Sequence, residues 1–390
     1  MTDFDAITAE HLRAVGGVKW SRFPDTIGAF IAEMDFGIAE PIKAALHRAV
    51  DQGAFGYLAQ APVRQMAQAY SNFAAERYGW QVDPADVHPL PDVLTGLGAA
   101  IRFLSRPGSP VIVPTPAYMP FLTIPQVYDR PIIQVPLVEQ DGHYTYDLEA
   151  LDEAFAAGGN LLVLCNPHNP VGRVLTTEEM LAVAEVVEAR GGRVFSDEIH
   201  APLVYPGHRH VPYASLNETT AGHTITATST SKAWNLPGLK AAQMILSNDS
   251  DRQAWTSAGP IAGGGTANLG VIAATAAYSS GTPWLQEVLT YLDANRQLVA
   301  DLVAEHLPGA RYRAPEGTYL GWLDLREVPT AGPPGSFFRR HAGVVVTDGA
   351  HCGHAGEGFV RYNFATPRPL LTEGITRMGE AVREQRSTTA

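Results

Sequence analysis

The sequence predicts an α/β protein in which a large domain, with a mostly parallel sheet flanked by helices, is joined to a smaller α+β domain. The chain has 390 residues, 45% of them hydrophobic, which is enough to bury a sizeable core. Short apolar runs alternate with helical patterns through residues 40–246, as expected where crossover helices cover both faces of a sheet. A long helical pattern at 284–306 then precedes a region of different spacing.

Residues before 40 show no regular pattern, and we expect them to be irregular. The first helix is expected at residues 40–53. Apolar residues recur at helical spacing from Ile42 to Ala49, and a glycine ends the pattern. A second helix is expected at 63–78, again before a glycine. A strand at 87–90 then leads through a turn into a helix at 93–103.

The same alternation continues as far as residue 246. We expect, in order, a strand at 111–113, a helix at 118–127, a strand at 132–135, a helix at 148–157, a strand at 161–164, a helix at 176–190, and strands at 194–196, 224–228 and 243–246. After the long helix, we expect strands at 319–325, 343–346 and 359–363 and helices at 336–341 and 370–383. The large domain is therefore assigned to residues 46–284, and the smaller one to 1–45 and 285–390.

The overall charge argues against several kinds of partner. Lys and Arg number 28 and Asp and Glu 40, a net charge of −12 that would repel nucleic acid or an anionic membrane surface. The two cysteines, Cys165 and Cys352, are too few for a disulfide framework and fit a reducing compartment. Because the first residues are polar and no apolar run approaches about 18–20 residues, we expect a cytoplasmic protein.

A lysine flanked by small hydroxyl residues follows the predicted strand at 224–228. The segment 228–240 reads TSTSKAWNLPGLK, with Lys232 next to Ser231 and a second cation, Lys240, at its end. Such a segment suits a site that binds a phosphate group and forms a Schiff base. Taken alone, it is more often an ordinary loop.

Two further polar segments follow neighbouring predicted strands. The turn 166–172 (NPHNPVG) can direct the amide of Asn169 towards a ligand at the carboxyl edge of the sheet, where open α/β sheets bind ligands. In the segment 196–200 (SDEIH), Asp197 is suited to lie against the ring nitrogen of a pyridine cofactor and keep it protonated. Each residue alone is more often a turn asparagine or a capping aspartate. Their order along the chain makes the combined signal specific.

In this order the segments resemble a known family. The chain resembles the fold-type I pyridoxal 5′-phosphate (PLP) enzymes of the class I/II aminotransferase superfamily, and within it the MalY/PatB group of cystathionine β-lyases (C–S lyases). The resemblance covers about residues 27–383 and implies the fold of those enzymes. The other segments that carry it are 32–36 (AEMDF), 55–57 (FGY), 91–94 (PDVL), 115–118 (TPAY), 317–325 (GTYLGWLDL) and 358–364 (GFVRYNF).

The resemblance implies a role for each matching residue. Lys232 is expected to form the Schiff base and to take the Cα proton of the substrate, and Asp197 to pair with the ring nitrogen. Arg361 is expected to clamp the substrate carboxylate, a bidentate task suited to arginine, with Asn169 and Tyr118 beside it. Further cofactor contacts are expected from Asn169 and His200 near the phenolic oxygen, Tyr118 on the ring, and Asp92, Val93, Ser229, Ser231, Lys240 and, from a neighbouring subunit, Tyr57 around the phosphate.

The implied activity is β-elimination on cysteine S-conjugates such as cystathionine, which gives thiol, pyruvate and ammonia. His200 and Lys240 stand where aminotransferases usually have Tyr and Arg, as in the lyase group, and this favours elimination. Either Lys232 or Tyr118 can protonate the departing sulfur. The segment 32–36 begins Ala-Glu where the family has Ala-Asp, so the resemblance leaves the substrate open. A small-molecule amino-acid substrate and a homodimer with a shared active site are implied.

Three alternatives to this function remain. The same residues serve an aminotransferase, or a specialised PLP enzyme that acts on a thiol conjugate in secondary metabolism by decarboxylation or another step. A catalytically silent regulator is the third, but such a protein need not keep the full catalytic set.

No metal site is expected. The segment 351–354 (HCGH) lacks a further Cys or His cluster at ligand spacing, and 208–210 (HRH) is interpreted as a polar loop. The glycines at 263–265 lack the spacing of a nucleotide-binding loop and are interpreted as a helix-start turn.

Overall fold

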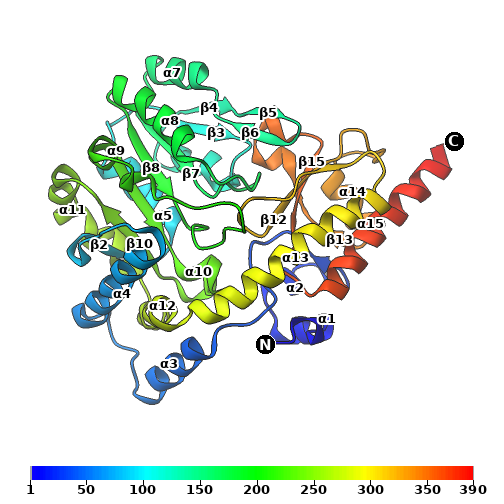
Figure 1. Cartoon of the computed structure of the whole chain (residues 1–390), viewed down its shortest axis with the longest axis horizontal. Coiled ribbons are helices and arrows are strands. Elements are labelled where there is room, and N and C mark those ends of the chain that lie inside the picture. The colour runs from blue at the N-terminus through cyan, green and yellow to red at the C-terminus, as the bar shows by residue number, and fades with distance from the viewer. Residues whose placement is uncertain (1, 390) are drawn as a thin grey trace.

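The computed structural model describes residues 2–389, and a seven-stranded sheet lies at its centre (Figure 1). The neighbours in this sheet, in order, are β2 (Val87–Leu90), β10 (Ala242–Leu246), β9 (Thr224–Thr228), β8 (Arg193–Asp197), β7 (Leu161–Cys165), β3 (Val111–Thr115) and β4 (Ile132–Pro136). Neighbouring strands are parallel except where β10 pairs with β9 and β2. The predicted mostly parallel sheet is therefore confirmed.

Helices cover both faces of this sheet because alternate strand residues point to opposite sides. On one face, Val111 and Val113 pack in a cluster with residues of α5 (Val93–Phe103) and α11 (Asp249–Ala262). On the other face, Ile112 belongs to a cluster with α7 (Leu148–Ala156) and α8 (Thr177–Ala189). β3, β7, β9 and β10 are buried at every position, and β7 (LLVLC) accordingly reads as a continuous apolar run.

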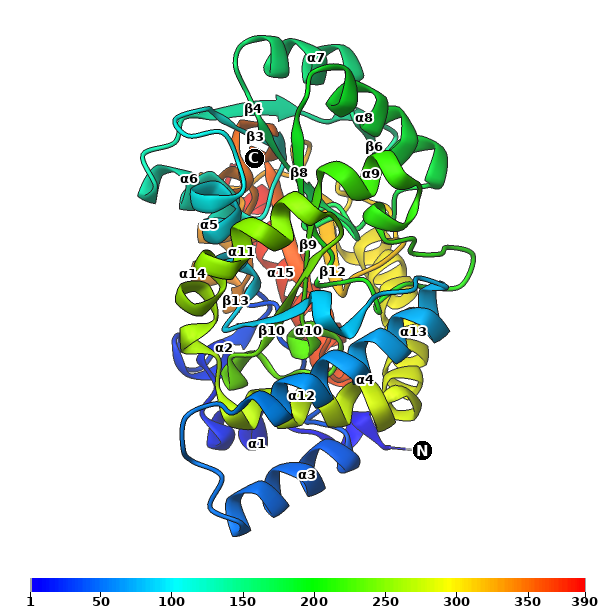
Figure 2. The same ribbon diagram turned by 90° about the vertical axis from the view of Figure 1, so that its left-hand side faces the viewer.

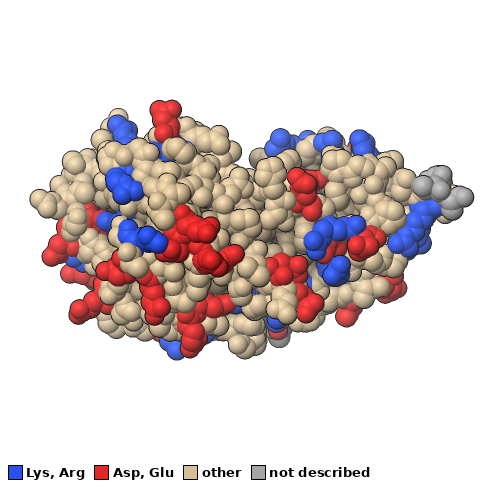
Figure 3. Space-filling view, turned by 90° about the horizontal axis from the view of Figure 1, so that it is seen from above, with Lys and Arg blue, Asp and Glu red and all other residues tan. Residues whose placement is uncertain are grey.

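A smaller antiparallel sheet lies beside the large one. Its strands, in order, are β11 (Arg311–Tyr312), β12 (Leu320–Asp324), β15 (Phe359–Asn363) and β14 (Thr347–Asp348). The long helices α13 (Thr282–His306) and α15 (Arg368–Thr389) run side by side along it (Figure 1), and α14 (Pro334–His341) packs nearby. The outline of the molecule narrows between a larger and a smaller lobe (Figure 3). The boundaries at residues 46 and 284 stay a prediction.

The N-terminal segment joins these two parts. After α1 (Ala9–Val15) and α2 (Val18–Ser21), β1 (Ile27–Gly28) pairs in parallel with β13 (Val344–Val345). The chain then passes the edge of the large sheet, where the side-chain amide of Asn235 bonds both the N–H and the C=O of Met34 at 2.9 Å. Residues 29–37 thereby lie over the loop that follows β9. Helix α3 (Glu40–Asp51) comes next and lies beside α12 (Asn268–Ser280), which in turn packs against α4 (Gln60–Tyr78) (Figure 2).

Several expected elements differ from the structure. The start of the chain is not irregular, since it forms α1, α2 and β1. The helix expected at 118–127 is wrong: prolines at 120 and 125 divide it into a 3₁₀ turn, Met119–Leu122, and the short α6, Ile124–Val127. The β5 (Val138–Gln140) and β6 (His143–Thr145) hairpin was not expected, nor were α9 (Glu218–His223) and α11. The glycines at 263–265, interpreted as a helix-start turn, do precede a helix, α12. Pro260 inside α11 weakens its helical pattern.

Two features bear on the classes of partner. Among residues 2–389, no helix is long and apolar enough to cross a membrane. Acidic and basic side chains are mixed over the face seen in Figure 3, and Asp and Glu gather on the larger lobe.

Candidate active site

A cavity of about 210 Å³ opens at the carboxyl ends of β3, β7, β8 and β9. Parallel strands end at one edge of a sheet, so the loops after them converge there. β3 leads to Tyr118, β7 to Asn169, β8 to Asp197 and β9 to Lys232. The residues that line the cavity are Ala32, Pro91, Asp92, Val93, Leu94, Tyr118, Cys165, Asn169, Asp197, Ile199, His200, Ser229, Ser231, Lys232, Pro237, Lys240 and Ala241.

Lys232 lies on the short helix α10 (Thr230–Ala233), whose N-cap is Ser229. The Ser229 hydroxyl accepts the N–H of Ser231 at 3.0 Å and donates to the carbonyl of Ala241 at 2.8 Å. The Nζ atom of Lys232 donates to the carbonyl oxygen of Ala32 at 2.7 Å. Burial of the amine, together with the nearby positive charge of Arg361, lowers the pKa of Lys232 to about 8. A neutral amine is therefore accessible near physiological pH.

Asp197 ends β8 with its side chain 3% exposed. Burial raises the pKa of its carboxyl to about 7. The hydrogen bond that Oδ1 accepts from the N–H of Ile199 at 3.0 Å lowers the pKa and offsets only part of this rise. Such a carboxylate is costly to keep charged unless a positive group lies beside it. The site therefore favours a cationic ligand atom at this position.

Arg361 comes from β15 of the smaller sheet and is 2% exposed. Its Nη1 donates to Oδ1 of Asn169 at 3.0 Å, and its Nη2 donates to the carbonyl of Phe30 at 2.8 Å and to Oγ1 of Thr347 at 3.2 Å. The Nε atom is buried without a hydrogen-bond partner in the described part of the chain. Within residues 2–389 this guanidinium forms no ion pair with a carboxylate, and with its spare N–H it is suited to bind an anionic ligand group.

Asp92 and Lys240 form the mouth of the cavity. Asp92 caps α5, since its Oδ1 accepts the N–H and the hydroxyl of Thr95 at 2.8 and 2.9 Å. Its Oδ2 lies 3.0 Å from Nζ of Lys240. Partial burial favours the neutral acid, but the hydrogen bonds from Thr95 and Lys240 outweigh it and hold the pKa of Asp92 below its ordinary value. The N–H groups at the start of α5 and the Lys240 ammonium together suit an anion.

His200 and Tyr118 face the cavity from two loops. His200 is 2% exposed, and its ring centre lies 5.9 Å from that of Tyr319. Burial, together with the positive charges of Lys232 and Arg361, holds the pKa of His200 well below its ordinary value, so the ring is neutral. Its Nδ1 is buried without a partner within residues 2–389. Burial also raises the pKa of Tyr118, which stays protonated at neutral pH.

The structure brings together every predicted site residue except Tyr57. Arg361 reaches the cavity through its contact with Asn169, and the other residues line it directly. Tyr57 lies in the loop between α3 and α4 with its side chain fully exposed. It borders a separate surface depression of about 980 Å³ that is also lined by Phe55, Trp255 and the glycines 263 and 264. Those glycines form a 3₁₀ turn between α11 and α12.

Two contributors to the site were not predicted individually. The carbonyl of Ala32 accepts hydrogen bonds from Lys232 and, at 2.9 Å, from the hydroxyl of Tyr319. Both Ala32 and Tyr319 lie in segments that carry the family resemblance, but no pattern in one sequence indicates a contact between residues so far apart. Across residues 2–389, no group of three or more His, Cys, Asp and Glu side chains is placed to hold a metal ion.

Comparison with known proteins agrees with this geometry. Residues 31–378 match the family described as aminotransferase class I and II. The chain is 39% identical to cystathionine β-lyase of Corynebacterium glutamicum over 96% of this chain and 98% of that one. It is 33% identical to cystathionine β-lyase PatB of Bacillus subtilis, over 94% and 96% of the two chains. The PLP-bound C–S lyase of Staphylococcus hominis, complexed with L-cycloserine, superimposes with a TM-score of 0.91 at 27% identity, over 98% of each chain. The chain therefore belongs to the class I and II aminotransferase family, and within it to the group that contains these cystathionine β-lyases.

Proposed function

We propose that the protein is a PLP-dependent C–S lyase that converts cysteine S-conjugates such as cystathionine, with water, into a thiol, pyruvate and ammonia. One observation carries this proposal: Lys232, Asp197 and Asn169 share one cavity, and Arg361 reaches into it from the other sheet. The relatives with cystathionine β-lyase and C–S lyase activity in their names support the reaction class.

The side chains present fit PLP. The buried carboxyl of Asp197 calls for a positive partner, which a protonated pyridine nitrogen provides. The Nδ1 atom of His200 and the Nε atom of Arg361 are buried polar atoms without partners in the described chain, and ligand oxygens would satisfy them. Lys240, Ser231 and the N–H groups of α5 would hold the phosphate.

The substrate would be oriented by its carboxylate. Arg361 is positioned to hold that group through its unpaired Nε–H, with the amide of Asn169 beside it. The lining residue Tyr118 is placed to cover one face of the bound ring. Because Asp197 and Arg361 are drawn from β8 and β15, the two ends of the bound molecule would be fixed by two different sheets.

Proton transfer falls to Lys232. When bound, PLP supplies an aldehyde that bonds an amine and a ring that accepts the electron pair of the Cα–H bond. Lys232, with its pKa lowered to about 8, would take the Cα proton as its neutral amine. The Cβ–S bond then breaks and its electron pair leaves on sulfur, which receives a proton from Lys232 or Tyr118. Hydrolysis of the remaining three-carbon fragment gives pyruvate and ammonia.

A product assay tests this proposal. The purified protein with PLP should release thiol and pyruvate in equal amounts from cystathionine and from S-methyl-L-cysteine, and Lys232→Ala should abolish both products and the visible absorbance of the lysine-bound cofactor. An aminotransferase would instead convert a keto-acid acceptor to an amino acid without releasing thiol. That result, or full thiol release by Lys232→Ala, would overturn the proposal.

We further propose that the active form is a homodimer in which Tyr57 contacts the phosphate bound by the other subunit. Tyr57 and Phe55 are large aromatic residues with fully and 66% exposed side chains, and they border the depression of about 980 Å³. Lys240 and Asp92 at the mouth of the cavity are also partly exposed. A second subunit would cover both regions. We place the protein in the cytoplasm, where its two free, buried cysteines would stay reduced.

A further inference from the structure

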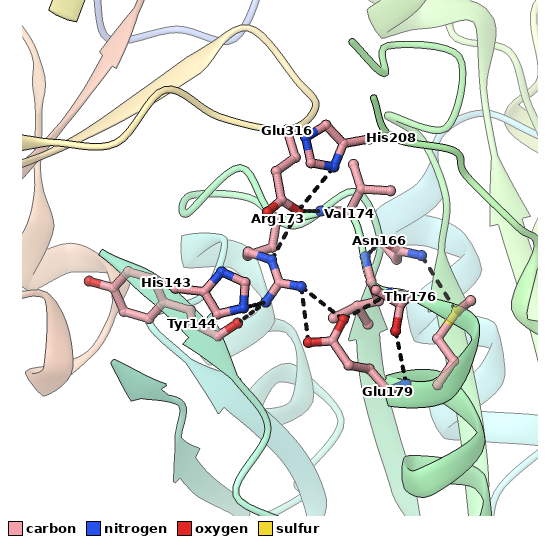
Figure 4. A network of polar contacts seen from close by, with 11 residues as sticks. His143, Tyr144, Asn166, Arg173, Val174, Thr176, Glu179, His208 and Glu316 are labelled. Carbon is pink, nitrogen blue, oxygen red and sulfur yellow. Dashed lines mark hydrogen bonds and ion pairs between the residues drawn. The ribbon is translucent and has the colours of Figure 1, made fainter. Parts of the chain in front are cut away.

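Arg173 is a buried arginine, 5% exposed, that lies four residues beyond Asn169. Its Nη2 lies 2.9 and 2.8 Å from the two carboxylate oxygens of Glu179, and its Nε lies 2.9 Å from Oε2 of Glu316 (Figure 4). Glu179 belongs to α8, which covers the large sheet, whereas Glu316 lies in the loop that leads to β12 of the smaller sheet. The guanidinium therefore links the two sheets.

Every N–H of this guanidinium has an acceptor. Besides the two carboxylates, Nη1 bonds the carbonyl of Tyr144 and Nε2 of His143, the latter at 2.9 Å (Figure 4). Burial and the positive charge of Arg173 lower the pKa of His143, in keeping with a neutral ring that accepts this bond. The Nδ1 atom of His208 also faces Glu316, at 3.9 Å. Five donors in a planar fork match this set of acceptors, and a lysine ammonium with three donors cannot.

The same pair is tied to the turn that presents Asn169. The carbonyl of Gly172 accepts the N–H groups of Glu316 at 2.8 Å and Gly317 at 3.0 Å. Within the turn, the N–H of His168 donates to the carbonyl of Arg173 and that of Gly172 donates to the carbonyl of His168, both at 2.8 Å. Backbone hydrogen bonds of Arg173 and Glu316 therefore hold the loop 168–173, which contains Asn169.

The other side of the contact leads to Arg361. The residues after Glu316 run directly into β12, which pairs with β15, and Trp322 of β12 stands opposite Arg361 in the register. Oε2 of Glu316 also accepts the N–H of Val174 at 2.8 Å. A displacement of Glu316 relative to Arg173 would therefore shift β12 and β15 against the Asn169 turn and change the 3.0 Å contact between Arg361 and Asn169.

We propose that Arg173 and Glu316 are positioning residues that set the relative placement of Asn169 and Arg361, and thereby the fit of the substrate α-carboxylate. This inference rests on the proposed function, in which those two residues hold the carboxylate. Neither positioning residue lines the cavity. A buried ion pair adds little net stability, because desolvation offsets the attraction, but it specifies one geometry when its hydrogen bonds are complete. The ion pair thus fixes the position of the two sheets relative to each other, and this position sets the distance between Asn169 and Arg361.

Two ligands that differ only by a carboxylate test the inference on the holoenzyme. L-Alanine and ethylamine are titrated against the absorbance of the bound PLP, and the ratio of their dissociation constants measures recognition of the carboxylate. Arg173→Lys and Glu316→Gln should each weaken L-alanine binding about tenfold and change ethylamine binding less than about twofold. The conservative Glu316→Gln keeps the shape of the side chain and guards against failure of Arg173→Lys to fold. The matched control is Arg190→Lys, since Arg190 makes a two-pronged pair with Asp152 that is 41% exposed on both sides.

The outcomes separate this inference from the proposed function. If wild type prefers L-alanine, Arg361→Lys loses that preference, and both positioning variants keep the wild-type ratio, the inference is wrong and the proposed function stands. If wild type binds L-alanine no better than ethylamine, the proposed carboxylate clamp is wrong, and the inference falls with it. A fall in the ratio for Arg190→Lys equal to that for Arg173→Lys would also overturn the inference, because any loss of an arginine pair would then suffice.

Discussion

The ammonium of Lys240 lies 3.0 Å from the carboxylate of Asp92 at the mouth of the cavity. A half-exposed pair of this kind contributes little to stability. The pair instead lowers the affinity of the cavity mouth for an anion. Asp92 offsets the positive charge of Lys240 and would repel a phosphate group. The carboxylate stays ionised at neutral pH, since its pKa is lowered.

Asp92→Asn should therefore tighten the binding of PLP and of inorganic phosphate to the apoprotein by about three- to tenfold. Asparagine is also a good N-cap, so α5 should keep its first turn. Fluorescence titration of the apoprotein measures both constants. Lys240→Ala is the opposing variant and should weaken both ligands; weaker binding by Asp92→Asn would show instead that the carboxylate holds Lys240 in place for the phosphate.

The carboxyl of Asp197 gives the apoprotein a distinct pH dependence. Its pKa is raised from 3.8 to about 7, so the folded state holds this proton more tightly than the unfolded state. Its contribution to stability is thus fully present below about pH 4 and is lost as the pH rises towards 7. Asp197→Asn should remove this loss, so that the free energy of unfolding of the variant exceeds that of wild type by an amount that grows from pH 4 to 7. Urea unfolding at several pH values measures the difference, and a constant gap would contradict the prediction.

The same variant, Asp197→Asn, should lose at least about 100-fold in kcat, because the ring nitrogen loses its partner.

The lowered pKa of Lys232 predicts how the apoprotein takes up its cofactor. The neutral amine is the nucleophile, so the rate of PLP recombination should rise with pH and level off near pH 8. Stopped-flow absorbance at constant ionic strength follows this reaction. A rate that still rises steeply towards pH 10.5 would show that the amine is not perturbed as the buried geometry requires.

A shared active site can be tested by mixing two inactive subunits. Tyr57→Ala and Lys232→Ala damage the same site from opposite subunits, so each homodimer should be inactive or nearly so. In a mixed dimer, one site receives an intact Lys232 from one subunit and an intact Tyr57 from the other. Co-expression in equal amounts should therefore restore about a quarter of wild-type activity. No recovery in a verified heterodimer would place Tyr57 and Lys232 in the same subunit's site, and full activity of the Tyr57→Ala homodimer would remove Tyr57 from the site.

The strand ends were the part of the molecule most open to prediction. Asp197 ends β8, and Asn169 and Lys232 lie in the turns that follow β7 and β9, so parallel topology alone places these residues at one edge of the sheet. The sheet itself was predictable because its strands are short, buried and rich in β-branched and apolar residues, as in β3 (VIVPT), β7 (LLVLC) and β9 (TITAT). Local composition and spacing contain all of this information.

Contacts between distant segments were not predictable in the same way. Glu316 and Arg173 are far apart in sequence, and either one alone reads as an ordinary surface charge. The Ala32 carbonyl leaves no trace in the sequence, since every residue has one. Helix α11 was missed because Pro260 lies inside it and interrupts the pattern by which a helix is recognised. These features depend on tertiary packing.

The acceptor for Lys232 is a main-chain oxygen, and this has a consequence for divergence among related enzymes. Replacing the side chain at position 32 does not delete that oxygen, which also receives the Tyr319 hydroxyl. Selection can therefore vary the side chains of this stretch to suit different leaving groups while the anchor of the reactive amine persists. Only a change in the path of the backbone, such as an insertion or deletion between β1 and α3, would remove it.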